Sequence, residues 1–355
     1  MKKVSSLLMF MATMAFVSCT KEDIKPELTS DFTVTYKTDF QNTIYPSMIF
    51  GLTEIEKQQH DTIDYFSISV NPNIETNLKI VIQESKLNFE TVITINKIKG
   101  EKKIIPSLKW KYDDLKNLTQ PGNVDLTFVC YGDNDKEIGR QNLKLSYRAI
   151  NECVLAAKID NKPVPLYFLI AGYINEDSPV IDAFLKQVLQ STYLSGFVGY
   201  QQGDSGIVAQ VSACFNTLRD KGIKYSSITS TSNSNSNIMS QYIRFSDEVL
   251  NNTQANCADG TVFFCSVLKK IGIHAVMVFV PGHVYLGYYT DNAKTKLNLL
   301  ETTMVGTTAS FSEASDYQID AFNLNLSKFN NTDFFDGYFI IDVDKARQII
   351  KPIGR

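Results

Sequence analysis

The spacing of the apolar residues changes near residue 150, and this change constrains the possible folds more than any other feature of the sequence. From residue 31 to about residue 147, apolar and polar residues alternate in short runs. A period of two residues is typical of strands with one buried face. Turn-forming segments such as 71–73 (Asn-Pro-Asn) and 121–122 (Pro-Gly) separate the runs, which favours an antiparallel β-sandwich. The predicted strands are Thr33–Tyr36, Tyr65–Val70, Leu78–Ile82, Thr91–Ile95, Val124–Val129 and Leu143–Tyr147.

Helical spacing replaces this alternation after about Asn151. Segments 179–194 and 208–218 carry apolar residues at intervals of three and four positions, which is typical of amphipathic helices. Pro179 suits the first turn of a helix, where a missing N–H is tolerated. Segment 226–237 is dominated by Ser, Thr and Asn, a composition that predicts an exposed loop; a role as a lid is the less favoured alternative.

Length and composition fit a globular protein of two domains. The chain has 355 residues, of which 44% are hydrophobic and 21% charged, a composition that excludes global disorder, collagen and coiled coil. With about 100–200 residues per domain, we predict an α+β protein: an Ig-like antiparallel β-sandwich over residues 31–150, followed by an α+β domain over 151–355. The net charge is −3 and the sequence lacks a dense Lys/Arg cluster, so nucleic acid is not an expected partner. His60 is predicted to lie in a solvated loop and not to bind a metal.

The first residues have the features of a secretory signal. A pair of lysines precedes an apolar stretch at 7–17 that is too short to span a bilayer, and Ser18 is a small residue directly before Cys19. The run Ala-Phe-Val-Ser-Cys at 15–19 resembles a bacterial lipobox, in which cleavage leaves a lipid-modified N-terminal cysteine.

This resemblance implies an exported lipoprotein. It predicts a signal peptide over 1–18, a lipid on Cys19 and a polar tether over 19–30, with membrane attachment through the N-terminal lipid. Residues 20–23 (Thr-Lys-Glu-Asp) resemble the surface-export signal of Bacteroidetes lipoproteins. The protein is therefore expected on the outer membrane, at either the cell surface or the periplasmic face. Ordinary cleavage near Ser18 without lipidation is the alternative.

Cysteine usage points to one special thiol. Six cysteines are present, and assigning Cys19 to the lipid leaves five. An odd number in an exported protein leaves at least one thiol unpaired and available for chemistry. Four of the five are predicted to be small buried hydrophobes, namely Cys130, Cys153, Cys214 and Cys265.

The fifth, Cys257, begins a predicted helix that ends before Gly272. Asn256 is a preferred N-cap residue, Asp259 can complete a capping box, and Gly272 suits the left-handed position after the last turn. At the first turn of a helix, the macrodipole and the free N–H groups stabilise a thiolate. Cys265, the alternative nucleophile, lies two turns inside the helix on the face expected to pack on a sheet. Cys257 is therefore the favoured nucleophile.

Three strands are predicted after this helix, over 274–280, 283–289 and 297–302. His283 starts the second strand and can face the helix N-terminus, and Glu301 near the end of the third can orient the imidazole. Nucleophilic thiol catalysis needs such a set, because the histidine takes the thiol proton and later gives it to the leaving amine. Zinc binding is the competing interpretation, but the cysteines and histidines lack the paired spacing of zinc sites, so no metal is expected.

Several short segments together resemble the transglutaminase-like superfamily. They are Gln241–Arg244, Asn256–Gly260, Leu268–Ile273, Gly282–Val284 and Leu300–Thr303. The resemblance covers about residues 205–310 and implies a papain-like fold, in which a helix N-terminus carries the cysteine and successive strands carry the histidine and the acid. It assigns Cys257 as the nucleophile, His283 as the base and Glu301 to the acid position.

The segments depart from the family pattern at three positions. Glu301 replaces the usual aspartate, His274 stands where proline is frequent, and Val284 follows the catalytic histidine in place of an aromatic residue. Each catalytic group is nevertheless present, so the departures bear on substrate preference and efficiency.

The predicted function is cysteine-dependent acyl transfer on peptide or amide bonds through a thioester on Cys257, with hydrolysis favoured over transfer to an amine. The Cys257 N–H can donate to the oxyanion, and Tyr225 and Gln241 are candidates for a second donor, although each can instead be a structural residue. A peptide or protein is the expected substrate, and no metal or organic cofactor is implied. The alternatives are a surface binding protein that uses the second domain as a non-catalytic scaffold, and glycan or protein binding by the β-sandwich.

Overall fold

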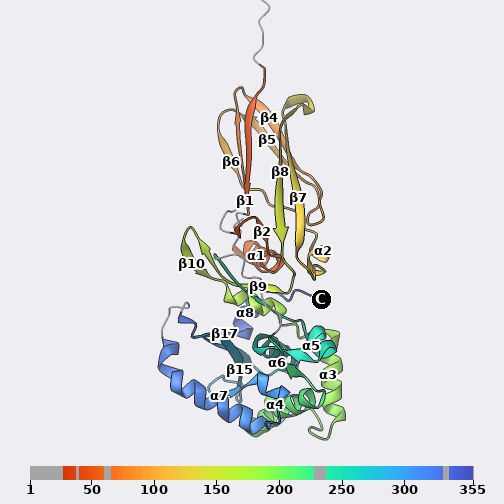
Figure 1. The fold of residues 1–355 in the computed structure, drawn as a ribbon, viewed down its shortest axis with the longest axis vertical. Helices are drawn as coiled ribbons and strands as arrows, with labels where there is room; N and C mark the ends of the chain where they lie inside the picture. The colour runs from red at the N-terminus through yellow and green to blue at the C-terminus, as the bar shows by residue number, and fades with distance from the viewer. Residues whose placement is uncertain (1–26, 37–39, 60–64, 228–236, 331–335, 355) are drawn as a thin grey trace, which may run out of the picture.

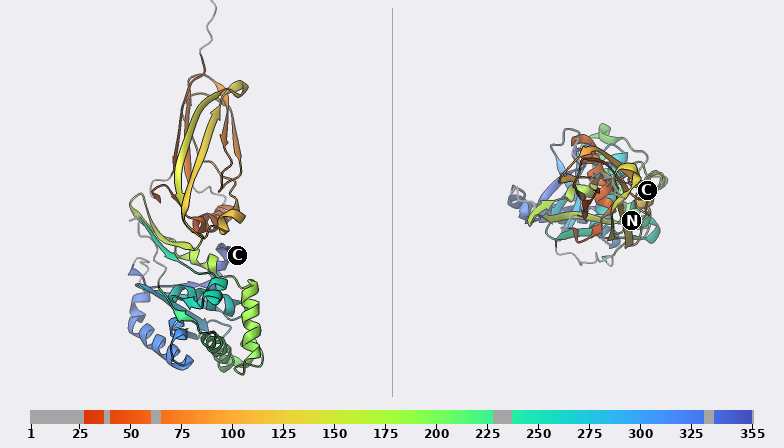
Figure 2. Two further views of the ribbon diagram at one scale, coloured as in Figure 1. Left: turned by 45° about the vertical axis from the view of Figure 1, so that its right-hand side comes forward. Right: turned by 90° about the horizontal axis from the view of Figure 1, so that it is seen from above.

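The computed structural model describes residues 27–36, 40–59, 65–227, 237–330 and 336–354. The fold is of the α+β class, with a β-rich part at one end of an elongated molecule and a mixed α and β part at the other (Figure 1). Figure 2 shows the same two parts stacked along the long axis from a second side. No helix in this described part of the chain is long and apolar enough to cross a bilayer.

Several predictions fall outside the described residues. The signal peptide, Cys19 as the lipidation site and most of the tether precede residue 27. His60 and residues 228–236 of the predicted loop also lie outside them. These assignments therefore stay predictions.

The β-rich part consists of two sheets that face each other. One has the order β1-β3-β6 (Ser30–Tyr36, Phe66–Pro72, Lys102–Ile104), and the other has the order β2-β8-β7-β4-β5 (Thr43–Ile44, Glu137–Tyr147, Gly122–Tyr131, Thr76–Ile82, Thr91–Ile98). Neighbouring strands pair antiparallel except β2 and β8, which are parallel. Side chains alternate between buried and partly exposed along the strands, and Phe66 of one sheet packs on Phe128 of the other with ring centroids 5.7 Å apart. All six predicted strands are present.

A helix lies within the region predicted to be entirely β, and the prediction is wrong at this point. Helix α1 (Pro46–Gln59) begins at a proline, which suits the first helical position. Met48 and Ile49 are buried, and the helix packs on β9 (Glu152–Ile159) and on the 3₁₀ segment η3 (Tyr167–Tyr173), where the two parts of the molecule meet (Figure 1). The second half of the α1 sequence is mostly polar and lacks apolar residues at helical spacing. The sequence pattern, which alternates on either side of it, therefore did not predict this helix. The β-rich part also contains the short helix α2 (Tyr112–Lys116) and the 3₁₀ turn η2 (Asp133–Asp135).

A four-stranded antiparallel sheet forms the centre of the mixed part. Its order is β16-β15-β14-β17 (Leu297–Leu300, His283–Tyr289, Ala275–Val280, Phe339–Asp342). Helix α6 (Cys257–Lys270) packs on β14 and β15. Helix α7 (Phe311–Asn325) covers the other face, where Val276, Val278 and Tyr285 form a second small core against it. The helix and the three strands predicted around the Cys, His and Glu residues are thus present.

Further helices pack around this sheet. The segments 179–194 and 208–218 that showed helical spacing form α3 (Pro179–Gln190) and most of α4 (Gly203–Asp220), so both predicted helices are confirmed. The remaining elements are η4 (Gly199–Gln202), the parallel pair β11 (Lys224–Tyr225) and β13 (Gln254–Ala255), α5 (Ser246–Asn252), η5 (Thr302–Gly306), η6 (Leu326–Asn330) and α8 (Val343–Ile349).

The mixed part also contains a three-stranded sheet that the sequence did not predict. Its order is β10-β9-β12, with β10 at Lys162–Pro165 and β12 at Ile238–Tyr242. Strand β9 lies where helical spacing was expected to begin, and β12 is short and far from β9 in the sequence. The register between the two shifts between Met239 and Ser240, so Leu155 of β9 is the extra residue of a β-bulge.

One hydrophobic core runs through both parts. Buried residues from Val34 in β1 to Ile353 near the C-terminus form a single cluster, which α1, β9 and η3 carry across the junction. Ile150, at the predicted domain boundary, is itself fully buried. The passage from the β-rich part to the mixed part is therefore a packed region and not an exposed linker.

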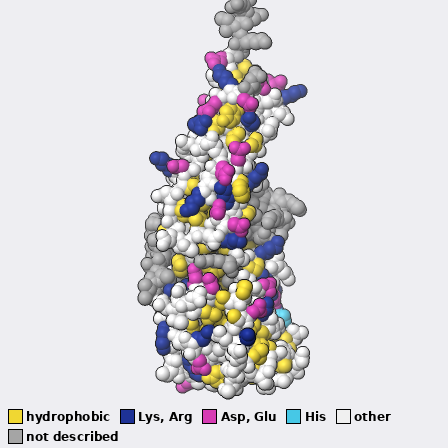
Figure 3. Space-filling model, turned by 90° about the vertical axis from the view of Figure 1, so that its right-hand side faces the viewer, with side chains coloured by type: hydrophobic (Ala, Val, Ile, Leu, Met, Phe, Trp, Pro, Cys, Tyr) yellow, Lys and Arg dark blue, Asp and Glu magenta, His cyan; other side chains and the backbone are white. Residues whose placement is uncertain are grey.

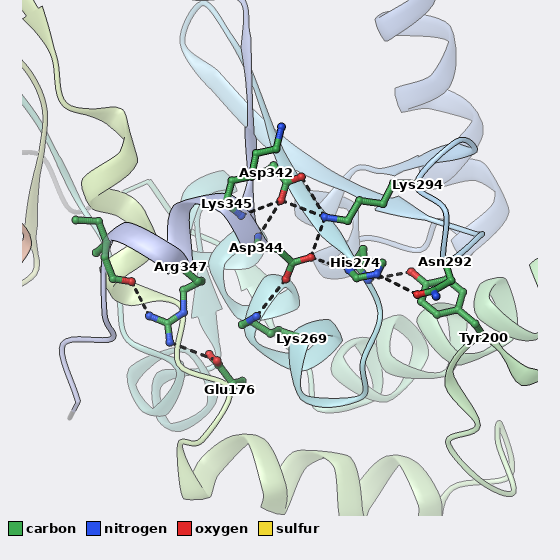
Figure 4. A network of polar contacts seen from close by, with 11 residues as sticks. Glu176, Tyr200, Lys269, His274, Asn292, Lys294, Asp342, Asp344, Lys345 and Arg347 are labelled. Carbon is green, nitrogen blue, oxygen red and sulfur yellow. Dashed lines mark hydrogen bonds and ion pairs between the residues drawn. The ribbon is translucent and has the colours of Figure 1, made fainter. Parts of the chain in front are cut away.

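A polar network fixes the C-terminal helix α8 to the central sheet (Figure 4). Asp344 accepts hydrogen bonds from Lys269 at 3.1 Å and Lys294 at 2.9 Å, and its carboxylate lies 2.6 Å from His274 Nδ1. Burial opposes the negative charge, but these bonds outweigh it and lower the pKa of Asp344 to about 2. His274 lies at the opposite end of the β14–β15 hairpin from His283, so its role is in this network.

Charges of both signs are interspersed on the face shown in Figure 3, over both parts of the molecule. Exposed ion pairs in the molecule join Lys79 to Asp135 and Lys296 to Asp204. On this face the basic side chains do not form a continuous stripe of the kind that nucleic-acid-binding proteins present.

Candidate active site

Cys257 occupies the first position of α6, where a capping box fixes the helix start. The Asn256 side chain accepts a hydrogen bond from the Asp259 N–H at 2.9 Å, and the Asp259 carboxylate accepts one from the Asn256 N–H at 2.9 Å. The predicted box is therefore confirmed, as is the left-handed Gly272 (φ 76°) that follows the helix. The Cys257 N–H is one of the first-turn donors that have no acceptor inside the helix. The Cys257 carbonyl accepts from the Thr261 hydroxyl at 2.7 Å.

A buried ion pair joins the start of α6 to the segment after β12. Asp259 is fully buried and Arg244 is 6% exposed, and Arg244 Nη1 lies 2.6 Å from Asp259 Oδ2. The Arg244 N–H also donates to Asp259 Oδ1 at 2.7 Å. Burial raises the pKa of Asp259, and the hydrogen bonds from Asn256 and Arg244 oppose that rise. The sequence analysis gave Arg244 no role; the available signal was an arginine placed between the apolar residues Ile243 and Phe245.

Gly260 allows α6 to approach the end of β16 closely. A Cβ atom on Gly260 would lie 2.8 Å from Thr302 Oγ1 and 3.1 Å from Thr302 Cβ. Glycine is required here for space, and this contact places Cys257, one turn earlier on the helix, near the residues that follow β16.

His283 lies between the Cys257 thiol and the Glu301 carboxylate. Its Nε2 is 2.7 Å from Glu301 Oε2, and a side-chain hydrogen bond joins the ring to Cys257. Because Nε2 faces Glu301, Nδ1 is the ring nitrogen left for the thiol. Burial disfavours charge on the ring, but the hydrogen bonds to Cys257 and Glu301 and the charges of both groups outweigh it and raise the pKa of His283 to about 10. The three side chains predicted to act together are thus in contact.

Glu301 is held by Thr303 as well as by His283. The Glu301 residue is 3% exposed, and its Oε1 accepts hydrogen bonds from the Thr303 N–H at 2.9 Å and the Thr303 hydroxyl at 2.6 Å. Burial works to raise the pKa of Glu301, but the bonds from His283 and Thr303 lower it overall. Both carboxylate oxygens are therefore occupied, which fixes the glutamate that stands in place of the usual aspartate. Thr303 belongs to a recognised segment, but the sequence analysis gave it no role.

Cys257 and His283 line a pocket of about 340 Å³. Its walls come from β9, η3, β12, the start of α6, the β14–β15 turn and the residues at the start of β17. Three aromatic side chains in the wall pack together: the ring centroid of Phe339 lies 4.2 Å from that of Tyr167 and 4.5 Å from that of Phe279. The candidate thiol and base thus lie beside a largely apolar space.

The two predicted oxyanion donors lie in different places. Gln241 is on β12 and lines the pocket, with its Nε2 donating to the Tyr242 carbonyl at 2.9 Å. Tyr225 is on β11, is 54% exposed and does not line the pocket. Gln241 is therefore the candidate that the structure brings near Cys257, and Tyr225 is not.

The four cysteines predicted to be core residues are buried and free. Burial raises the pKa of Cys130 to about 11 and that of Cys214 to about 12. It raises the pKa values of Cys153 and Cys265 further still. Among the cysteines that the structure describes, Cys257 is the one with partial exposure.

Comparisons with known proteins give weak structural similarity and no family assignment. No protein-family model matches the chain, and no curated protein matches it. Among solved structures, red sea bream transglutaminase is similar, with 11% sequence identity, a TM-score of 0.24 and coverage of 79% of this chain. The chain spans about half the length of that protein, 54%. A TM-score of this size does not establish a shared fold, so the candidate site stands on its own geometry.

Proposed function

We propose that this protein catalyses cysteine-dependent acyl transfer on peptide or amide bonds, with water as the acceptor, through a thioester on Cys257. The observation that carries the proposal is the placement of His283 between the Cys257 thiol and the buried Glu301 carboxylate, at the wall of an apolar pocket. A protein that only binds a ligand has no need for a thiol, an imidazole and a carboxylate in this order.

The chemistry starts with proton transfer. His283 Nδ1 accepts the Cys257 proton, and the thiolate sulfur attacks the carbonyl carbon of the bound amide. The tetrahedral oxyanion then collapses with cleavage of the C–N bond, and His283 gives the proton to the leaving amine. In the second half, His283 takes a proton from water, which attacks the thioester and releases the carboxylic acid and the thiol. Glu301 holds the Nε2 proton and stabilises the imidazolium.

Two groups are the proposed donors to the oxyanion. The Cys257 N–H points out of the first turn of α6, and the Gln241 amide nitrogen has a second N–H besides the one donated to Tyr242. Removing one oxyanion donor lowers kcat by about 10²–10³-fold in enzymes of this chemical type.

The proposed domain types and the proposed location of the protein are based on the sequence. Residues 31–150 are proposed to be an Ig-like β-sandwich domain and residues 151–355 a papain-like domain of transglutaminase-like type. Cys19 is proposed to carry the lipid that anchors the exported protein to the outer membrane.

The test is the rate of iodoacetamide alkylation at Cys257 between pH 5 and pH 9, measured by peptide mass spectrometry on residues 20–355. An ordinary cysteine with a pKa of about 8.5 is only about 0.3% thiolate at pH 6 and reacts slowly there. We expect Cys257 to react about 10-fold or more faster than that at pH 6, and His283→Ala to abolish the difference. Labelling that follows an ordinary thiol, unchanged in His283→Ala, would overturn the proposal and favour the scaffold.

A further inference from the structure

We propose that the pocket beside Cys257 binds a large apolar side chain of an extended peptide, whose backbone pairs with the outer edge of β12. This inference rests on the proposed function and names its substrate class.

The wall of the pocket is suited to an apolar side chain. Tyr167, Phe279 and Phe339 supply an aromatic surface, and Leu155 and Met239 add aliphatic atoms. Met239 lines the pocket and is 47% exposed, so part of its side chain is accessible to a ligand. A volume of about 340 Å³ is at the lower end of the range for ligand sites, which suits one large side chain and the backbone next to it.

The charges in the pocket favour the same class of ligand. Among the described residues that line it, the charged side chains are His283 and Asp336, and no lysine or arginine is present. An acidic side chain would therefore find no cationic partner other than the catalytic imidazolium. The pocket is expected to select against Asp and Glu.

The register of β12 shows which backbone groups near the pocket face away from β9. The Ile243 N–H donates to the Asn151 carbonyl at 2.8 Å, so residues 243 and 241 direct their backbone groups toward β9. Ser240, between the positions that face β9, therefore directs its N–H and C=O away from it. In the described part of the chain, β9 is the one strand paired with β12, and Ser240 itself lines the pocket. An extended peptide can add to such an edge through its main chain while a side chain enters the pocket.

The β-bulge links the two features. The register of β9 and β12 shifts between Met239 and Ser240, and Leu155 is the extra residue on β9. A bulge redirects a side chain out of the regular alternation, and Leu155 lines the pocket. The bulge that interrupts the regular pairing therefore also supplies an apolar wall beside the outward-facing backbone of Ser240.

The experiment compares alkylation rates at Cys257 for ketone probes that share one leaving group. The probes are acetyl-Gly-Phe, acetyl-Phe-Gly, acetyl-Gly-Gly and acetyl-Gly-Asp acyloxymethyl ketones, with iodoacetamide as the probe without a peptide. We expect at least one Phe probe to react about 10-fold or more faster than the Gly-Gly probe, and the Asp probe to react no faster than it. Methylation of the backbone nitrogen of the preferred Phe probe is expected to remove most of that advantage, because it removes a donor to the strand edge.

Variants of the protein test whether the faster reaction of the Phe probe depends on this pocket. Met239→Asp is expected to lower the ratio of the Phe rate to the Gly-Gly rate by about 5-fold or more. The matched control is Leu324→Asp on α7, an exposed residue that does not line the pocket, and its ratio is expected to stay unchanged. Equal rates for the Phe and Gly-Gly probes, with fast iodoacetamide labelling at pH 6, would overturn the proposal that the pocket binds an apolar side chain. That result would leave the proposed function intact.

Slow iodoacetamide labelling at pH 6 would instead overturn the proposed function. The pocket is then tested by equilibrium binding of acetyl-Gly-Phe amide, measured by NMR line broadening of the peptide. Binding that Met239→Asp weakens and Leu324→Asp does not supports the pocket, and absence of binding overturns it.

Discussion

Replacing Asp259 with asparagine measures how much the buried carboxylate at the start of α6 contributes to the stability of the fold. The carboxylate accepts hydrogen bonds from the Asn256 N–H, the Arg244 N–H and the Arg244 guanidinium. Asparagine has the same shape but one acceptor oxygen, so its NH₂ group must face at least one of these donors. The change also leaves the Arg244 guanidinium, which is 6% exposed, without its carboxylate counter-charge. Breaking a buried ion pair in this way lowers the free energy of unfolding by about 3–5 kcal/mol.

Urea denaturation followed by far-UV circular dichroism provides the measurement. Asp316→Asn on the exposed face of α7 is the matched control, and its effect is expected to stay within about 0.5 kcal/mol. Adding Arg244→Met to Asp259→Asn removes the unpaired cation and is expected to recover part of the loss. A loss below about 1 kcal/mol for Asp259→Asn, or no recovery in the double variant, would refute the reasoning.

Three further predictions concern stability. Gly260→Ala is expected to lower the free energy of unfolding by about 1–3 kcal/mol because of the 2.8 Å contact with Thr302 Oγ1, and Thr302→Ala should restore part of it in urea melts; full stability of the single variant would contradict this. The pKa of His283 is raised to about 10 and that of Glu301 is lowered, so the pair stabilises the fold fully only above about pH 4.5 and below about pH 6.5. The stability of the native protein relative to Glu301→Gln should therefore fall on acidification and as the pH rises toward 10 in thermal melts, and a flat difference would show that the two groups are not coupled. The pKa of Asp344 is lowered to about 2, so its stabilisation relative to Asp344→Asn should be complete above about pH 4 and disappear as the pH falls toward 2; a difference that survives at pH 2 would argue against the ionic network.

The start of α6 shows what the sequence could predict. The N-cap, the capping partner and the closing glycine lie within one segment, and each acts on its immediate neighbours. The sequence also predicted that Cys257, His283 and Glu301 lie near one another, because they follow in order on a helix and at two successive strands, and short connections keep successive strands adjacent. Their contact in the structure agrees with that placement, and their catalytic roles stay predictions.

The residues and strands that surround the site could not be predicted from the sequence in the same way. Arg244 meets Asp259 only after the chain has folded back on itself, and β9 and β12 pair across a long stretch of intervening chain. Helix α1 escaped prediction because the residues that bury it, in β9 and η3, are in the other part of the molecule. In each case tertiary packing decides the structure, and neither local propensity nor periodicity carries that information.

The residues that line the pocket range along the chain from Leu155 in β9 to Phe339 in β17. The order in which the chain is synthesised therefore determines when the pocket can form. The ribosome delivers the chain from the N-terminus, so β9 is made well before its partner β12. A nascent chain that already carries Cys257 and His283 still lacks Phe339 and the strand that completes the central sheet. The thiol therefore meets a finished binding pocket only after the chain has been made as far as Phe339, and any reaction that depends on this pocket must wait for that point.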